Sequence, residues 1–167
     1  INPNNCVLNV PTDAKRNYME HDIWGQFLNI ENVDVKKITI TTSVNNPDYG
    51  NVSGGGEHSK GTQLTITAIP NEGYHFVKWS DGELNATRTI KVTADVTLTA
   101  EFAINVYTVT LSAENGTVTG AGEYNHGTEV TLTATPAEGY HFVKWSDGDT
   151  NATRTITVTA DVTRSAE

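Results

Sequence analysis

The sequence predicts a mainly β protein, made of two tandem small β-rich modules that follow a short strand–helix segment. Three observations support this fold class. The 167 residues include 26 threonines beside many valines, isoleucines and tyrosines, and such side chains fit the half-buried surface of a pleated sheet. Apolar residues at helical spacing are almost absent. Residues 37–103 also recur closely as residues 107–167, which is typical of tandem modules.

The repeat has a constant offset of 66 residues. The segment EGYHFVKWSDG begins at Glu72 and again at Glu138, and about 25 of the 30 positions from 72 to 101 are identical in the second copy. The first copy carries an insert near positions 45–49. We therefore expect an N-terminal segment at 1–36, a first repeat at 37–103 and a second repeat at 107–167, with linkers at 31–37 and 103–105.

Strand and turn signals alternate along the second repeat. Its predicted strands lie at 107–112, 130–135, 140–146, 153–159 and 162–166. Asn115-Gly116 is a tight-turn dipeptide, because both residue types accept a positive φ. Pro136 ends the second of these strands because proline has no N–H to donate to a neighbouring strand. Asp147-Gly148 predicts a further turn after the aromatic strand.

Each repeat has one tryptophan and a Tyr-x-Phe pair, which we expect to form its small core. These predicted core residues are Tyr74, Phe76, Trp79, Tyr140, Phe142 and Trp145. Each aromatic side chain buries roughly 150–250 Å², so three of them dominate a core of this size. The tryptophan follows the phenylalanine by three residues, which breaks strict alternation. Either a β-bulge turns the tryptophan inward, or the strand is covered on both faces.

The two repeats are small and their ends differ. A module of about 60–65 residues is marginally stable alone, which favours contact between neighbouring repeats. Arg164 stands in the second repeat where the first has Leu98, and the second copy ends before a counterpart of Phe102. We therefore expect the last strand of the second repeat to be looser, or its core face to be partly open.

A family resemblance rests on the part of the repeat in which the two copies are most alike. The first repeat reads AIPNEGYHFVKW from Ala68, the second reads ATPAEGYHFVKW from Ala134, and an Asp-Val-Thr follows in both. This order resembles the divergent InlB B-repeat family and the related Listeria–Bacteroides repeats of bacterial surface proteins, over about three quarters of the chain. The resemblance implies small β-rich folds, grasp-like in some relatives, that serve as spacers or interaction units on exported proteins. It implies no catalysis.

The first 36 residues have a different pattern. They predict a strand at 5–11, a short helix over 14–20 capped by Thr12 or Asp13, and one tight helical turn in the apolar cluster at 23–30. They resemble the last repeat of a BspA-type leucine-rich-repeat array at Cys6, Leu8, Val10, Pro11, Tyr18, Trp24, Phe27 and Ile30. A solenoid repeat cannot bury its face alone, so this resemblance implies that the chain is the C-terminal part of a longer protein.

The charge and the cysteine count exclude several classes of function. A formal net charge of −9 argues against binding of nucleic-acid phosphates and against a polybasic membrane anchor. No stretch approaches the ~20 consecutive apolar residues of a transmembrane helix. The single cysteine, Cys6, cannot form an internal disulfide. We interpret it as a small apolar strand residue, since no neighbouring histidine motif would activate it as a nucleophile.

No metal or cofactor site is expected. His75 and His141 are equivalent but lack further ligands at zinc spacing. The run Asp147, Asp149, Asn151 is similar to the first half of a calcium loop, but the glycine and glutamate required at its sixth and twelfth positions are missing. We therefore interpret this run as a polar hairpin turn.

Catalytic residues are not expected either. The sequence has no glycine-rich phosphate loop, no Ser-His-Asp order and no paired-carboxylate spacing. Arg88 and Arg154 recur after the tryptophan turn, where they either stack on Trp79 and Trp145 as cation–π pairs or remain solvated on a strand face. Because we assign the aromatic residues to the core, we do not expect them to form a sugar-binding platform.

Together these patterns predict a non-enzymatic repeat region of an exported bacterial protein that is secreted or located on the cell surface. Its repeats are expected to act as a spacer or stalk and to contribute to adhesion. The alternative is a module that binds a glycan or a host protein. Neither hypothesis requires a cofactor, nucleic acid or a membrane-spanning segment.

Overall fold

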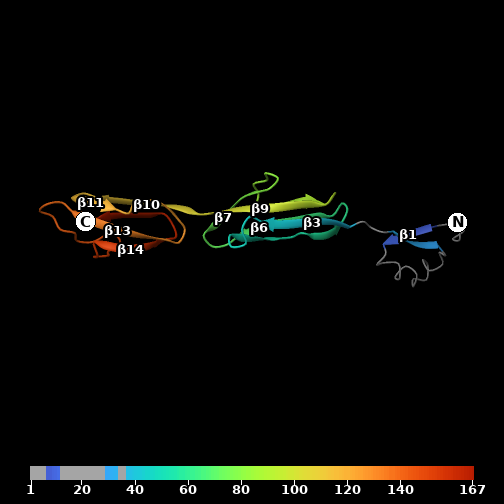
Figure 1. Cartoon of the computed structure of the whole chain (residues 1–167), viewed down its shortest axis with the longest axis horizontal. Helices are drawn as coiled ribbons and strands as arrows, with labels where there is room; N and C mark the ends of the chain where they lie inside the picture. Colours follow the sequence, from blue (N-terminus) through green and yellow to red (C-terminus); the bar gives the residue numbers. More distant parts are fainter. Residues whose placement is uncertain (1–6, 12–28, 34–36) are drawn as a thin grey trace. The chain divides into compact units, whose positions relative to one another are not determined.

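The computed structural model describes residues 7–11, 29–33 and 37–167, and within these ranges every regular element is a β-strand (Figure 1). The predicted mainly β fold is confirmed. The residues form two compact units. Unit 1 comprises the described residues up to Thr41 together with Gly54–Thr65 and Thr89–Thr97, and unit 2 comprises Thr42–Ser53, Ile66–Arg88 and Leu98–Glu167.

In unit 1, the strands nearest the N-terminus are β1 (Val7–Pro11) and β2 (Asn29–Val33), which pair in parallel along their whole length. β1 confirms the predicted strand over residues 7–11, and positions 5 and 6 lie outside the described residues. The helical turn predicted at 23–30 and the linker predicted at 31–37 are wrong where they overlap β2, because those residues pair with β1. The predicted helix at 14–20, Cys6 and the rest of the leucine-rich-repeat-like segment lie outside the described residues.

The remainder of unit 1 contains a small apolar core. β3 (Lys37–Val44) pairs antiparallel with β5 (Gly56–Ser59). Successive side chains of a strand point to opposite faces, and along β3 the buried residues alternate with exposed ones. The buried members of this core are Ile38, Ile40 and Val92, and Leu64 and Ile90 pack against them.

The first repeat continues through five more strands: β4 (Gly50–Ser53), β6 (Gln63–Pro70), β7 (Tyr74–Trp79), β8 (Thr87–Lys91) and β9 (Val96–Ile104). Its strands form a four-stranded sheet in the order β5-β3-β9-β7 and a three-stranded sheet in the order β4-β6-β8. In unit 2, the inward faces of β6 and β9 bury Ile66, Ala68, Leu98, Ala100 and Phe102.

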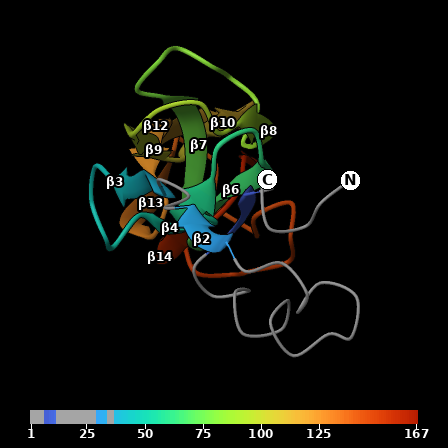
Figure 2. The ribbon, with the colours of Figure 1, turned by 90° about the vertical axis from the view of Figure 1, so that its right-hand side faces the viewer.

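The second repeat lies wholly in unit 2 and has six strands: β10 (Val106–Ala113), β11 (Gly116–Thr119), β12 (Gly122–Asn125), β13 (Thr128–Pro136), β14 (Thr153–Val158) and β15 (Val162–Ala166). They form two sheets, ordered β12-β10-β15 and β11-β13-β14. Both views place β10 on one side of this repeat and β13 with β14 on the other (Figure 1, Figure 2). The buried core of the repeat consists of Val109, Val130, Leu132, Ala134, Trp145 and Val158.

The same aromatic sequence has different backbone structures in the two repeats. In the first repeat, β7 pairs antiparallel with β9, and Phe76 lies opposite Phe102. The aromatic strand predicted at 140–146 is wrong for the second repeat, where an isolated bridge joins Trp145 to Ala166. Since β15 ends at Ala166, its ladder places no residue opposite positions 140–142.

Gly116 is needed for a reason other than the predicted turn. Its φ is not positive, in contrast to Gly120 with a φ of 105°. A Cβ at Gly116 would lie 2.5 Å from the carbonyl oxygen of Thr135 on the paired strand. The glycine therefore permits a close approach of β11 and β13, which the Asn115-Gly116 dipeptide alone did not indicate.

Candidate functional site

The two tryptophans are completely buried. The indole Nε1 of Trp79 donates to the Asn85 carbonyl at 3.0 Å, and that of Trp145 donates to the Asn151 carbonyl at 2.9 Å. The register of β7 and β9 shifts between Phe76 and Lys78, so the bulge explanation for the inward tryptophan is confirmed in the first repeat. With ring and N–H both engaged inside the fold, neither tryptophan is available to a ligand.

The other predicted core aromatics are distributed unevenly. Phe76 and Phe142 are half-buried and each contacts its tryptophan at a ring-centroid distance of 5.7 Å. Tyr74 is half-buried and stacks on Tyr49 at 4.4 Å. Tyr140 is 58% exposed, so the prediction that it belongs to the core is wrong. In its repeat, Asn115 precedes Gly116 where Tyr49 precedes Gly50, and no strand pairs with the segment that carries Tyr140.

Each tryptophan is followed by an acidic loop, and the first aspartate of that loop forms an ion pair with an arginine. Arg88 bonds Asp81 at 2.7 Å in the first repeat, and Arg154 bonds Asp147 at 2.8 Å in the second. The structure thus shows a third arrangement for these arginines, an ion pair, beside the two that the sequence suggested. Arg164 also bonds Asp147, at 2.9 Å. The Arg164 side chain is partly exposed, and residues 164–166 are half-buried. The equivalent residues Leu98 and Ala100 of the first repeat are buried. The last strand of the second repeat thus has the partly open core face that we expected.

These contacts lower the pKa values of the loop carboxylates. The hydrogen bond from Arg88 holds the pKa of Asp81 below its ordinary value. Burial raises the pKa of Asp147, but the hydrogen bonds from Arg154 and Arg164 outweigh it and leave that pKa lowered. Hydrogen bonds from the backbone and side chain of Asn151 lower the pKa of Asp149. The carboxylates of the calcium-like run are thus already partnered by protein donors.

An acid-stability prediction follows from these lowered pKa values. A carboxyl group whose pKa is lower in the folded state stabilises the fold above its unfolded pKa of about 4 and loses that contribution as the pH falls through the folded value. We expect the melting temperature to drop on acidification below about pH 4. In the double variant Arg88→Gln, Arg154→Gln this drop should be smaller, because the paired carboxylates then titrate closer to their ordinary range. Thermal melts of both proteins over the same pH series test this, and parallel curves would contradict it.

Metal ligation has no support in the part of the chain that the structure describes. No group of three or more His, Cys, Asp or Glu residues lies close enough there to hold an ion. His75 Nδ1 instead lies 2.8 Å from Asn105 Oδ1, while His141 is exposed. Among the same residues, no helix has the length and apolarity to cross a membrane.

A single residue, Asn105, connects the last strand of the first repeat to the first strand of the second. The linker predicted at 103–105 is therefore wrong except for this residue, because β9 extends to Ile104 and β10 starts at Val106. The Asn105 N–H donates to the Gly73 carbonyl and its own carbonyl accepts from the His126 N–H, both at 2.8 Å. Its side chain reaches His75, as above, and Asn105 Nδ2 donates to the Tyr107 hydroxyl at 3.3 Å. Asn105 thus forms hydrogen bonds with residues of both repeats.

His126 completes this joint. Its ring lies 6.0 Å from the ring of Tyr107, centroid to centroid. It also lies so close to Gly73 that a Cβ at that position would collide with it. Its Nδ1 atom is buried without a hydrogen-bond partner among the described residues. Position 73 therefore disfavours any other residue for two separate reasons, the positive φ of 81° and the ring of His126.

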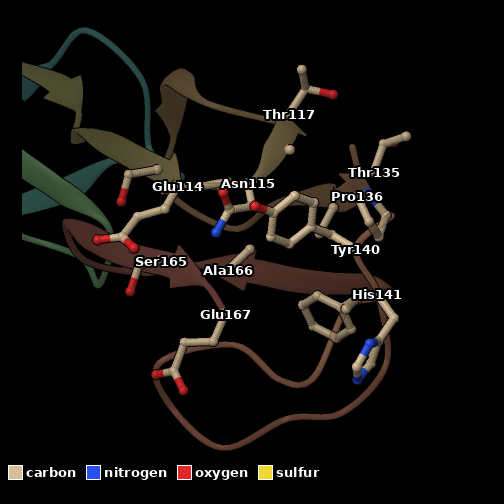
Figure 3. Close-up of a pocket in the computed structure, with 15 residues that line it drawn as sticks. Glu114, Asn115, Thr117, Thr135, Pro136, Tyr140, His141, Ser165, Ala166 and Glu167 are labelled. Atoms are coloured by element: carbon tan, nitrogen blue, oxygen red, sulfur yellow. The ribbon is translucent and has the colours of Figure 1, made fainter. Parts of the chain in front are cut away.

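A groove of about 730 Å³ opens beside Tyr140 in the second repeat. We call it the Tyr140 groove; it is lined by residues 112–117, 134–136, 140–142 and 165–167. The carboxylates of Glu114 and Glu167 lie toward one end of it and Pro136 and His141 toward the other (Figure 3). The groove has acidic, hydroxyl and aromatic walls but no arranged nucleophile and base.

Sequence reasoning missed both the Asn105 joint and the Tyr140 groove. The joint brings together residues from different strands, and at the offset of 66 only its Gly73 and His75 have equivalents of the same residue type. The groove had one signal in the sequence, the replacement of Leu98 by Arg164 in the second repeat. That replacement suggested a partly open core face but did not place it beside Tyr140.

Comparison with known proteins agrees with this architecture. A family model described as the divergent InlB B-repeat domain matches residues 40–106 and again residues 107–167. The chain is also similar to Internalin H of Listeria monocytogenes serovar 1/2a, with 36% identity over 93 residues. That match covers 53% of this chain and 17% of Internalin H, so the chain spans only a small part of that relative. Two family matches that together cover most of the chain place it, with two copies of the repeat, in the divergent InlB B-repeat family.

Proposed function

We propose that this chain is a non-enzymatic repeat region of an exported bacterial protein, secreted or located on the cell surface, where the repeats act as a spacer. In this role they hold an N-terminal leucine-rich segment away from the envelope and assist adhesion. The observation that carries the proposal is the joint at Asn105. A spacer needs neighbouring repeats that keep a defined connection, and the hydrogen bonds that Asn105 shares with Gly73, His75, Tyr107 and His126 supply it.

The repeat architecture supports the same proposal in two further ways. Both tryptophans are buried and hydrogen-bonded within their own repeats, and the acidic loops form ion pairs with arginines of the same repeat. The features that recur in both repeats therefore stabilise each repeat. Repetition of such a unit adds length without a new fold. The similarity to Internalin H and the family match support the location on the cell exterior.

A display experiment tests the spacer role. The chain is anchored to a bacterial surface through its C-terminus, with a peptide tag at its N-terminus, and bead-bound antibody measures access to the tag. In a matched variant, residues 40–167 are replaced by the same number of Gly and Ser residues. Such a coil has an r.m.s. end-to-end distance of only about 60 Å and no fixed direction, so we expect fewer beads to bind.

A third version, carrying unrelated rigid β-modules of the same number of residues, serves as the control. It should restore bead binding if the repeats act by holding the tag at a distance. Bead binding equal in the native and Gly-Ser versions would contradict the spacer proposal.

The Tyr140 groove favours a second candidate function, in which the repeat binds a glycan or a host protein. An exposed aromatic ring beside a polar groove is a suitable contact surface for either ligand, because aromatic side chains combine apolar area with a polar group. A glycan array and a pull-down from host-cell extract, each with the native chain and with Tyr140→Ala, test this candidate. Saturable binding that is lost in Tyr140→Ala would support it.

A further inference from the structure

We infer that residues 45–49, which connect β3 to β4, hold the first-repeat side of the Asn105 joint in place. We call this connection the 45–49 strap. Asn45 and Tyr49 are its positioning residues, because they act through the two segments that lead to Gly73 and to Asn105. The inference rests on the proposed spacer role, since it concerns the connection on which that role depends.

The strap forms a tight turn of its own. The Tyr49 N–H donates to the Asn46 carbonyl at 3.1 Å, and the Asp48 N–H donates to Asn46 Oδ1 at 2.9 Å. Such turns favour asparagine at the first position, where its side chain bonds the backbone, and proline at the second, here Pro47, where the ring fixes φ. The corresponding connection between β10 and β11 has only residues 114 and 115. The turn is therefore an addition to the first of the two repeats.

One side of the strap is bonded to the end of β9. Asn45 Oδ1 accepts from the Phe102 N–H at 3.0 Å, and Asn45 Nδ2 donates to the Phe102 carbonyl at 2.9 Å. The Asn45 N–H donates to the Ala100 carbonyl at 3.1 Å. An amide side chain has both a donor and an acceptor, so it can bond both backbone groups of one strand residue. Asn45 thus fixes β9 shortly before the chain reaches Asn105.

The other side of the strap is bonded to the turn between β6 and β7. The Asn71 N–H donates to the Tyr49 carbonyl at 2.9 Å, and Asn71 Nδ2 donates to the Asp48 carbonyl at 3.0 Å. The Tyr49 ring stacks on the Tyr74 ring with their centroids 4.4 Å apart. The Tyr74 N–H closes the turn by donating to the Asn71 carbonyl at 3.1 Å. Gly73 lies inside this turn, so the strap helps to fix the position of its carbonyl group.

Gly73 needs such support because it lies beyond the end of a strand ladder. The pairing of β7 with β9 ends with Tyr74 opposite Ile104. The next contact outward is the bond from the Asn105 N–H to the Gly73 carbonyl at 2.8 Å, and terminal pairs open more readily than central ones. The strap bonds both segments that meet in this pair, and we expect it to keep the pair closed. A closed pair also keeps Gly73 against the His126 ring of the second repeat.

Amide hydrogen exchange of the full chain, followed by ¹H–¹⁵N NMR, tests the inference in the variant Tyr49→Ala. The Asn105 N–H reports opening of the joint, whereas the N–H groups of Trp79 and Ala134, each bonded within its own repeat, report the stability of the repeats. A stacked aromatic pair changes an equilibrium constant by about two- to tenfold. We expect exchange at Asn105 to become faster by that factor, while Trp79 and Ala134 keep their native rates.

Two control variants separate the strap from general destabilisation. Tyr49→Phe keeps the stacked ring and should show the native exchange rate at Asn105. Arg88→Gln removes an ion pair of the same repeat outside the strap and should also leave that rate unchanged. If Tyr49→Ala does not fold, Asn71→Ala, which removes the single side-chain bond to the Asp48 carbonyl, takes its place under the same criteria.

Two results would overturn the inference. One is an unchanged exchange rate of Asn105 in Tyr49→Ala, and the other is an equal increase at Asn105 and Trp79, which would show a loss of stability throughout the first repeat. Failure of the spacer proposal is a different observation, namely equal bead binding of the native and Gly-Ser versions. Each failure can therefore be recognised without the other.

Discussion

Replacement of Trp145 by alanine is expected to lower the free energy of unfolding of the second repeat by about 3–5 kcal/mol. The indole is fully buried among Val109, Leu132 and Val158, so its removal leaves a cavity in a very small core. It also removes the donor to the Asn151 carbonyl, which is one of the hydrogen bonds that hold the acidic loop. Urea denaturation followed by circular dichroism measures the change.

Tyr140→Ala is the matched control, because it removes an aromatic ring of the same repeat that is largely exposed. Surface substitutions usually change stability by less than about 0.5 kcal/mol, and we expect that result here. If Trp145→Ala left stability unchanged but abolished binding of a ligand, the assignment of this tryptophan to the core would have to be abandoned.

The second large effect is expected at the joint between the repeats. Gly73 and Gly139 are equivalent and have φ values of 81° and 83°. Alanine in this left-handed region costs roughly 1–2 kcal/mol, so both substitutions should destabilise the chain. At Gly139 the space for a Cβ is open, whereas at Gly73 the His126 ring occupies it. Gly73→Ala should therefore cost measurably more than Gly139→Ala and should shift the amide resonances of Asn105 and His126.

A double-mutant cycle isolates the joint from the backbone strain. His126→Ala removes the ring that the new Cβ would meet, so the extra cost of Gly73→Ala over Gly139→Ala should disappear in that background. Such coupling energies between contacting residues usually amount to about 0.5–3 kcal/mol. Identical costs of the two glycine substitutions in the native background would contradict the contact between Gly73 and His126 in solution.

The fold class and the tryptophan core could be predicted from the sequence because their signals are local. Alternating threonines and aliphatic residues favour strands. The three-residue step from Phe76 to Trp79 indicated either a bulge or a strand covered on both faces, and the structure has the bulge in the first repeat. The glycines were less predictable. Gly116 permits a close approach to the backbone of Thr135 on another strand. This requirement depends on tertiary packing and not on the neighbouring Asn115.

The aromatic segment shows where local sequence reasoning fails. EGYHFVKW is identical in the two repeats, yet it contains β7 in the first and no strand in the second. Strand formation depends on a partner more than on intrinsic preference, and β9 provides that partner only in the first repeat. The exposed position of Tyr140 therefore follows from residues that lie elsewhere in the chain.

The pairing of β10 with β15 has a mechanical consequence. These are the first and last strands of the second repeat, and they run parallel over five residue pairs from Val109 opposite Val162 to Ala113 opposite Ala166. Tension applied to the two ends of the repeat would slide these strands past each other in shear. All the hydrogen bonds between them would then bear load together instead of opening one by one, which would make the repeat resistant to stretching.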